Sequence, residues 1–93
     1  MPFLYELKLA AGEPPFTFVQ QLIPAGSLAG TGQALATVTD GTMEYHITAP
    51  LQGLLAAWNV EHGDIIEPGD TLARLVAEGD EKPVADAVAV RLG

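Results

Sequence analysis

The sequence predicts an all-β protein, a flattened β-barrel or sandwich of short antiparallel strands. Apolar and polar residues alternate over short stretches, few stretches have the spacing of a helix, and glycine-containing turns separate the apolar stretches. The chain also contains an internal repeat. Two similar halves, each too small to close its own core, are expected to pack face to face.

The repeat aligns VQQLIPAGSLAGTGQALATV with AAWNVEHGDIIEPGDTLARL, which pairs Gly26 with Gly63 and Gly32 with Gly69 at an offset of 63 − 26 = 37 residues. Each half predicts a strand, a glycine turn, a short polar segment, a second glycine turn and another strand. Glycine suits these turns because it adopts the positive φ that they need. The predicted turn glycines are therefore Gly26, Gly32, Gly63 and Gly69.

The alternation of apolar residues predicts strands at about residues 3–9, 16–23, 34–39, 43–48, 53–60 and 71–76. In the fourth of these, the side chains expected to point inward are Met43, Tyr45 and Ile47, and those expected to point outward are Glu44, His46 and Thr48. The predicted core residues near the seam between the halves are Trp58, Phe16, Phe18 and Leu22.

Residues 1–79 are predicted to form one domain and residues 80–93 a C-terminal tail, because a charged run, EGDEK, begins at Glu78. Pro83 suits the first turn of a short helix, whereas Val84, Val88 and Val90 fit an extra strand almost as well. Among these alternatives we favour a loosely packed appendage.

The composition limits the classes of partner. The 93 residues include 4 Lys and Arg against 12 Asp and Glu, a formal net charge of −8, so no basic stripe can neutralise phosphates. We expect no nucleic acid or membrane partner, and instead a protein with a basic surface. Cysteine is absent, which excludes disulfides and thiolate metal ligands. Because the N-terminal segment has no basic n-region and Glu6 and Lys8 interrupt its apolar residues, it predicts neither a signal peptide nor a spanning helix, and we expect a cytoplasmic protein.

A β-hairpin is predicted in ALATVTDGTMEYHITAP, residues 34–50. Asp-Gly between two alternating apolar stretches is among the strongest signals for a two-residue hairpin turn. The predicted tip consists of Asp40, Gly41, Thr42 and Met43.

Four segments, GTGQALATV, the hairpin, APLQGLL and VEHGDIIEPGDTLARL, together resemble the biotinyl/lipoyl attachment domain family over about residues 3–77. The family's Gly-Asp-x-Val-x-x-Gly-x-x-Leu turn is matched by residues 63–72, and its Ala/Ser-Pro-x-x-Gly step by residues 49–53. The resemblance implies two quasi-symmetric four-strand antiparallel halves, a barrel-sandwich hybrid.

In that family a lysine at the hairpin tip carries lipoate or biotin through an amide, and the cofactor supplies the chemistry. Counting back from Pro50 without gaps places Thr42 at this position, and threonine cannot form the amide. Lys8 lies in the first predicted strand, Lys82 lies beyond the barrel, and no lysine lies between them. We therefore expect no cofactor.

Other candidate sites have simpler interpretations. His46 and His62 lack a third ligand at a recognisable spacing, so no metal site is predicted. Asp64, Glu67 and Asp70 lie in one loop but lack the glycine and the terminal glutamate of a calcium loop, and are expected to be solvated acids. No set of nucleophile, base and orienting residue is visible, and the protein is not expected to be an enzyme.

The resemblance implies a degenerate, unmodified lipoyl/biotinyl-like domain that acts in protein–protein interaction or as a noncatalytic module, with a basic surface of a 2-oxoacid dehydrogenase or biotin-dependent multienzyme complex as the expected partner. One alternative is a swinging-arm carrier modified with lipoate or biotin at an unexpected residue. Another is a small-molecule binding or enzymatic domain that uses the hairpin tip and the two histidines.

Overall fold

The computed structural model describes residues 1–92, which contain strands and no helix. The strands are β1 (Phe3–Lys8), β2 (Phe16–Gln21), β3 (Leu28–Ala29), β4 (Ala34–Thr39), β5 (Glu44–Thr48), β6 (Gly53–Trp58), β7 (Ile65–Ile66), β8 (Thr71–Ala77) and β9 (Ala89–Arg91). Within this part of the chain there is consequently no helix with the length and apolar character to cross a membrane.

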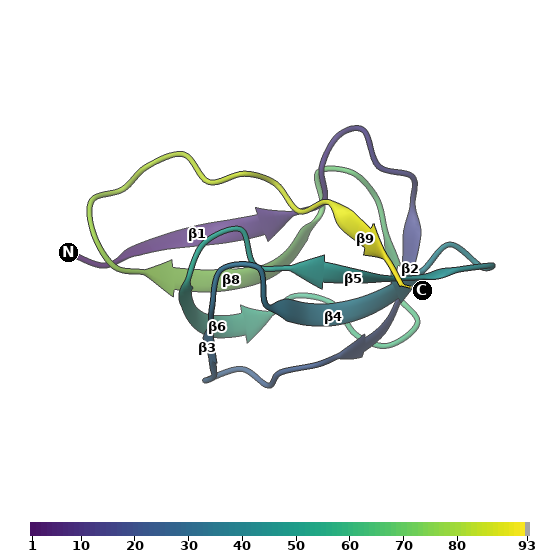
Figure 1. The fold of residues 1–93 in the computed structure, drawn as a ribbon, viewed down its shortest axis with the longest axis horizontal. Coiled ribbons are helices and arrows are strands. Elements are labelled where there is room, and N and C mark those ends of the chain that lie inside the picture. The colour runs from purple at the N-terminus through teal and green to yellow at the C-terminus, as the bar shows by residue number, and fades with distance from the viewer. Residues whose placement is uncertain (93) are drawn as a thin grey trace.

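Two antiparallel sheets make up the fold, which confirms the all-β prediction (Figure 1). One sheet has the order β1-β8-β6-β3 and the other β7-β2-β4-β5-β9. Strands such as β1 alternate buried and exposed residues, so each sheet turns one apolar face toward a shared core. The sheets do not close into a barrel, so the arrangement is a sandwich.

The predicted repeat has a direct structural counterpart. Strands β2, β3 and β4 are related to β6, β7 and β8 by the same sequence offset. Each half contributes its two-residue strand to the sheet of the other half, because β3 pairs with β6 and β7 pairs with β2. Matching hydrogen bonds accompany the exchange: Gly26 N–H donates to the Leu55 carbonyl at 2.7 Å, and Gly63 N–H to the Phe18 carbonyl at 2.8 Å. Each half is therefore hydrogen-bonded into the sheet of the other half.

The turn glycines occupy the conformation that the repeat requires. The φ angles of Gly26, Gly32, Gly63 and Gly69 are +98°, +81°, +91° and +90°, a region that L side chains rarely adopt. Between each pair of glycines lies one of the short strands β3 and β7, where the sequence pattern predicts only a polar segment. Two residues are too few for an alternating pattern to be recognised.

The core near the seam differs from the prediction at one position. Phe16 and Phe18 are buried, and Trp58 is partly buried with its ring centroid 5.6 Å from that of Phe18. Leu22 is 39% exposed and does not fill the core. The pairing of β2 with β4 shifts register between Phe18 and Gln20, and β2 ends at Gln21, so the alternation that pointed Leu22 inward does not continue to it.

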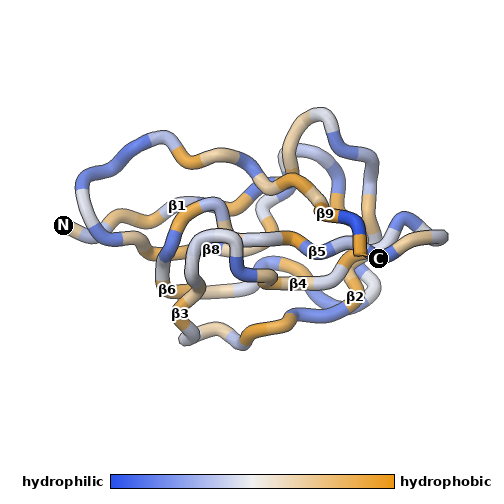
Figure 2. The backbone as a smooth tube through the Cα atoms, in the orientation of Figure 1, coloured by the Kyte–Doolittle hydropathy of each residue, from blue (hydrophilic) through white to orange (hydrophobic). Residues whose placement is uncertain are grey.

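The C-terminal segment is not a loosely packed appendage, so this prediction was wrong. It forms β9, which pairs with β5, and Ala87 is only 2% exposed. The Ala87 N–H donates to the Lys8 carbonyl at 2.7 Å, and the Ala87 carbonyl accepts from Ala10 N–H at 2.9 Å. The hydrophilic residues after β8 form a connection that returns the chain to the core (Figure 2). Of the alternatives weighed from the sequence, the extra strand is the one that forms.

Candidate functional site at the hairpin tip

The β4–β5 hairpin lies at one end of the molecule, and the N-terminus lies at the other end of its 42 Å long axis (Figure 1). Four residues, Asp40 to Met43, connect the two strands, and Thr42 is exposed among them. Gly41 has φ +100° but Asp40 has no positive φ, so the two-residue Asp-Gly turn predicted from the sequence is not formed and a four-residue connection takes its place. The geometry presents the Thr42 side chain to solvent at the far end of a paired hairpin.

Asp40 organises this turn with its own carboxylate. One carboxylate oxygen, Oδ1, accepts hydrogen bonds from Thr42 N–H at 2.9 Å and Met43 N–H at 2.8 Å. Thr39 supports the same turn, because its hydroxyl donates to the Met43 carbonyl at 2.8 Å and accepts from Gly41 N–H at 3.1 Å. The polar groups of the tip are thus largely used to hold the turn itself.

Tyr45 connects the turn to the core. Its hydroxyl donates to the second Asp40 oxygen, Oδ2, at 2.9 Å, and its ring packs edge-on against Phe16 with the centroids 5.0 Å apart. This link was missed in the sequence analysis, which used Tyr45 only as an inward-facing strand residue. The link depends on the register, because Tyr45 pairs with Val38 and Asp40 is therefore its diagonal neighbour across the hairpin.

Hydrogen bonding sets the acidity of both partners. The Met43 N–H, the Thr42 N–H and the Tyr45 hydroxyl stabilise the charged carboxylate and lower the pKa of Asp40 below its usual 3.8. The same carboxylate raises the pKa of Tyr45, because ionising the phenol would remove the donor and place two negative charges together.

We expect the turn to lose order only below the pH at which an ordinary aspartate is protonated. The pKa of Asp40 is lower in the folded protein, so the contribution of its hydrogen bonds is present above the ordinary aspartate pKa and is lost as the pH falls through the folded value. In an NMR titration, the Thr42 and Met43 amide shifts should move with a midpoint below 3.8. Asp40→Asn should abolish that step. A midpoint at or above the ordinary value contradicts the hydrogen-bonded geometry.

The two lysines lie away from the tip. Lys8 ends β1, and its Nζ lies 3.8 Å from a Glu6 carboxylate oxygen in a solvent-exposed pair. Lys82 is exposed in the connection between β8 and β9. Neither side chain lies in a tight turn between two paired strands, which is the setting in which a carrier lysine is presented.

His62 and the acidic loop make structural hydrogen bonds, and His46 is a strand residue. His62 Nδ1 donates to the Val19 carbonyl at 2.6 Å, and His46 lies on β5 opposite Thr37 and Val90. Asp64 and Asp70 each accept a backbone N–H three residues earlier in the chain, at 2.8 and 2.9 Å, and so close their own turns. Within residues 1–92, no three His, Asp or Glu side chains gather as they would around a metal ion.

No protein-family model and no curated protein sequence matches the chain.

Proposed function

We propose that this protein is a lipoyl/biotinyl-like module that carries no prosthetic group and acts through protein–protein contacts. The observation that carries the proposal is the residue at the tip of the hairpin. Thr42 is exposed there, at the position aligned with the modified lysine of biotinyl/lipoyl attachment domains. A hydroxyl does not form the amide link, and the nearest backbone and carboxylate groups are already engaged in closing the turn.

The repeated architecture supports the resemblance on which this proposal rests. Two halves related by one sequence offset exchange their short strands, and the hairpin of one half projects from the end of the sandwich. The negative charge of −8 supports a partner with a basic surface, such as a subunit of a 2-oxoacid dehydrogenase or biotin-dependent complex. Opposite charge speeds encounter and disfavours wrong partners.

The test is the intact mass of the protein after co-expression with a lipoate ligase and, separately, with a biotin ligase. We expect the mass calculated from the sequence in both cases. A gain equal to one lipoyl or biotinyl group would establish the alternative, a carrier modified at an unexpected residue, and peptide mapping would then identify that residue.

A further inference from the structure

The outer face of the β1-β8-β6-β3 sheet carries a row of apolar side chains that crosses all four strands. Strand register places Leu4 opposite Val76, Val76 opposite Leu54, and Leu54 opposite Leu28. Leu4, Leu28 and Leu54 are 57%, 71% and 39% exposed. Cross-strand neighbours lie about 5 Å apart, so these four residues form one continuous surface, here named the apolar row.

The other sheet provides an internal comparison, because the repeat offset of 37 residues relates Leu28, Leu54 and Val76 to Ile65, Thr17 and Thr39. The corresponding row joins Glu44 to Thr39, Thr39 to Thr17, and Thr17 to Ile65 by the same cross-strand pairing. Three of its four positions are polar or charged. The sandwich therefore does not need apolar residues on its outer face at these positions, and the apolar row is a difference between two otherwise similar halves.

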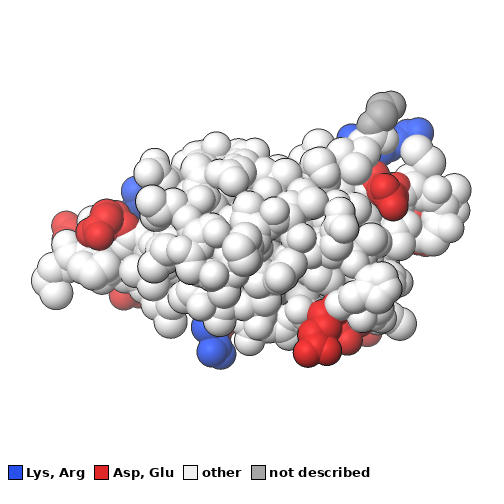
Figure 3. All heavy atoms as spheres, turned by 90° about the horizontal axis from the view of Figure 1, so that it is seen from below, with Lys and Arg blue, Asp and Glu red and all other residues white. Residues whose placement is uncertain are grey.

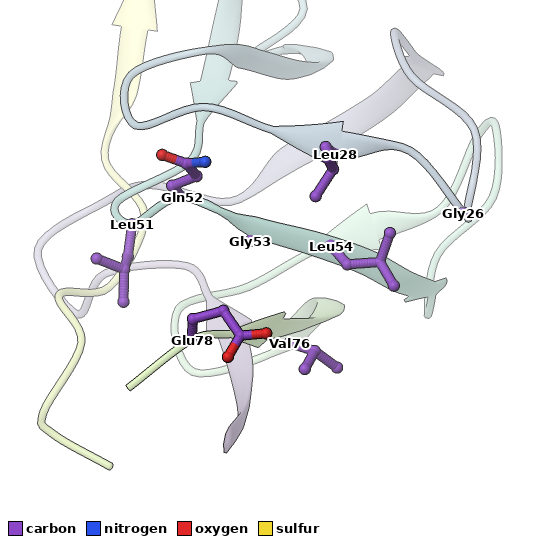
Figure 4. A pocket seen from close by; sticks show the side chains of 8 residues that line it. All are labelled: Gly26, Leu28, Leu51, Gln52, Gly53, Leu54, Val76 and Glu78. Atoms are coloured by element: carbon purple, nitrogen blue, oxygen red, sulfur yellow. The ribbon is translucent and has the colours of Figure 1, made fainter. Parts of the chain in front are cut away.

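A groove runs along three of the four residues of the apolar row. It is lined by Leu28, Leu54 and Val76 from three adjacent strands, with Leu51 and Gln52 at one end and Glu78 beside Val76 (Figure 4). A broad part of the surface viewed from below has few charged side chains, and acidic groups gather toward its ends (Figure 3). The groove thus combines an apolar floor with a carboxylate at its edge.

We propose that the apolar row and its groove bind a peptide segment of a partner protein that carries apolar side chains next to lysine or arginine. The apolar side chains would cover the row, and the cation would pair with Glu78. The Glu78 carboxylate at the groove and the net charge of −8 favour a cationic partner. This inference deepens the proposed interaction role and rests on it.

A second copy of the chain fits this surface less well. Two copies would bring two charges of −8 together. A stable protein pair buries about 800 Å² on each partner, which would be about 15% of the 5191 Å² surface of this chain. The four partly exposed side chains of the apolar row offer much less area than that. An area of this size suits a short peptide segment.

The test measures the affinity of the full chain for three fluorescent peptides, in which Leu alternates with Lys, Leu with Glu, and Ser with Lys. We expect the Leu/Lys peptide to bind and the other two to bind at least tenfold more weakly. The Leu/Glu peptide lacks the cation, and the Ser/Lys peptide lacks the apolar side chains. Equal binding of all three peptides, or no binding of the Leu/Lys peptide, would overturn the proposal.

Matched variants locate the binding. Leu28→Thr combined with Leu54→Thr should reduce Leu/Lys affinity by on the order of tenfold or more, whereas Ile65→Thr, at the repeat counterpart of Leu28, should leave it unchanged. Both changes lie on exposed residues, so unfolding midpoints serve as a check that the fold is retained. Glu78→Gln should weaken binding and reduce its salt dependence more than Glu81→Gln, which removes the same charge outside the groove.

Two further outcomes separate this proposal from others. Self-association that disappears in the Leu28→Thr and Leu54→Thr double variant would identify a second copy as the occupant and overturn the peptide assignment. If the natural protein has the mass calculated from its sequence and does not bind the Leu/Lys peptide, the docking surface is rejected and the proposed function is not. A gain in mass equal to a cofactor rejects the proposed function, whatever the result of the peptide experiment.

Discussion

Ala87→Asp should lower the free energy of unfolding by about 3–5 kcal/mol at neutral pH, the usual cost of an uncompensated buried charge. Ala87 is 2% exposed, and its own N–H and carbonyl are hydrogen-bonded to Lys8 at the end of β1 and to Ala10 just after it. Its bonded neighbour Lys8 carries a cation, but the Lys8 Nζ lies 3.8 Å from a Glu6 carboxylate oxygen in a solvent-exposed pair, so a carboxylate at position 87 would be buried without a partner. Chemical denaturation monitored by tryptophan fluorescence measures the change, with Trp58 as the single tryptophan.

The control for this change is Ala85→Asp, which adds the same charge at an exposed position two residues earlier and should cost less than about 0.5 kcal/mol. Lowering the pH should restore part of the stability of Ala87→Asp, because the neutral acid is cheaper to bury than the anion. Equal stability of the two variants would mean that the C-terminal segment does not pack as β9 and its neighbours place it.

Gly53→Ala should lower the free energy of unfolding by roughly 3 kcal/mol, at the upper end of the usual cost of overpacking. A Cβ at this position would lie 2.8 Å from the Val76 carbonyl oxygen and 3.2 Å from its carbon, so β6 and β8 would have to separate. Backbone atoms held in a sheet cannot rotate away as the end of a flexible side chain can.

Gly12→Ala is the matched control, because a Cβ there meets no atom within 4 Å and Gly12 has no positive φ. We expect a change below about 0.5 kcal/mol for Gly12→Ala in the same denaturation experiment. If Gly53→Ala is equally mild, β6 and β8 do not approach each other as closely as the sandwich requires.

Much of the fold could be predicted because local chemistry and the repeat agree. The alternation in residues such as Tyr5 and Leu7 gives the strands, and the offset between Gly26 and Gly63 gives the halves. The exchange of β3 and β7 could not be predicted, because it depends on which sheet edge lies nearby after folding. The packing of Ala87 was missed for the same reason: alanine carries no strong strand signal, and its partner Leu9 lies far away in sequence.

Part of the candidate site could likewise be predicted from the sequence, and part could not. The hairpin and the exposed position of Thr42 follow from local sequence, whereas the four-residue form of the turn and the hydrogen bond between Tyr45 and Asp40 need the strand geometry. The apolar row is not visible along the chain, because Leu4, Leu28, Leu54 and Val76 come from four strands. It becomes recognisable only when the register aligns them and the repeat supplies a polar row for comparison.

The central claim is that this scaffold lacks a prosthetic group because of one residue, and Thr42→Lys tests it most directly. The natural protein and the variant are each co-expressed with a lipoate ligase and with a biotin ligase, and their intact masses are compared. The account predicts no gain for the natural protein and a gain of one cofactor group, mapped to position 42, for Thr42→Lys. A modified natural protein, or a folded Thr42→Lys variant that neither ligase modifies, contradicts it.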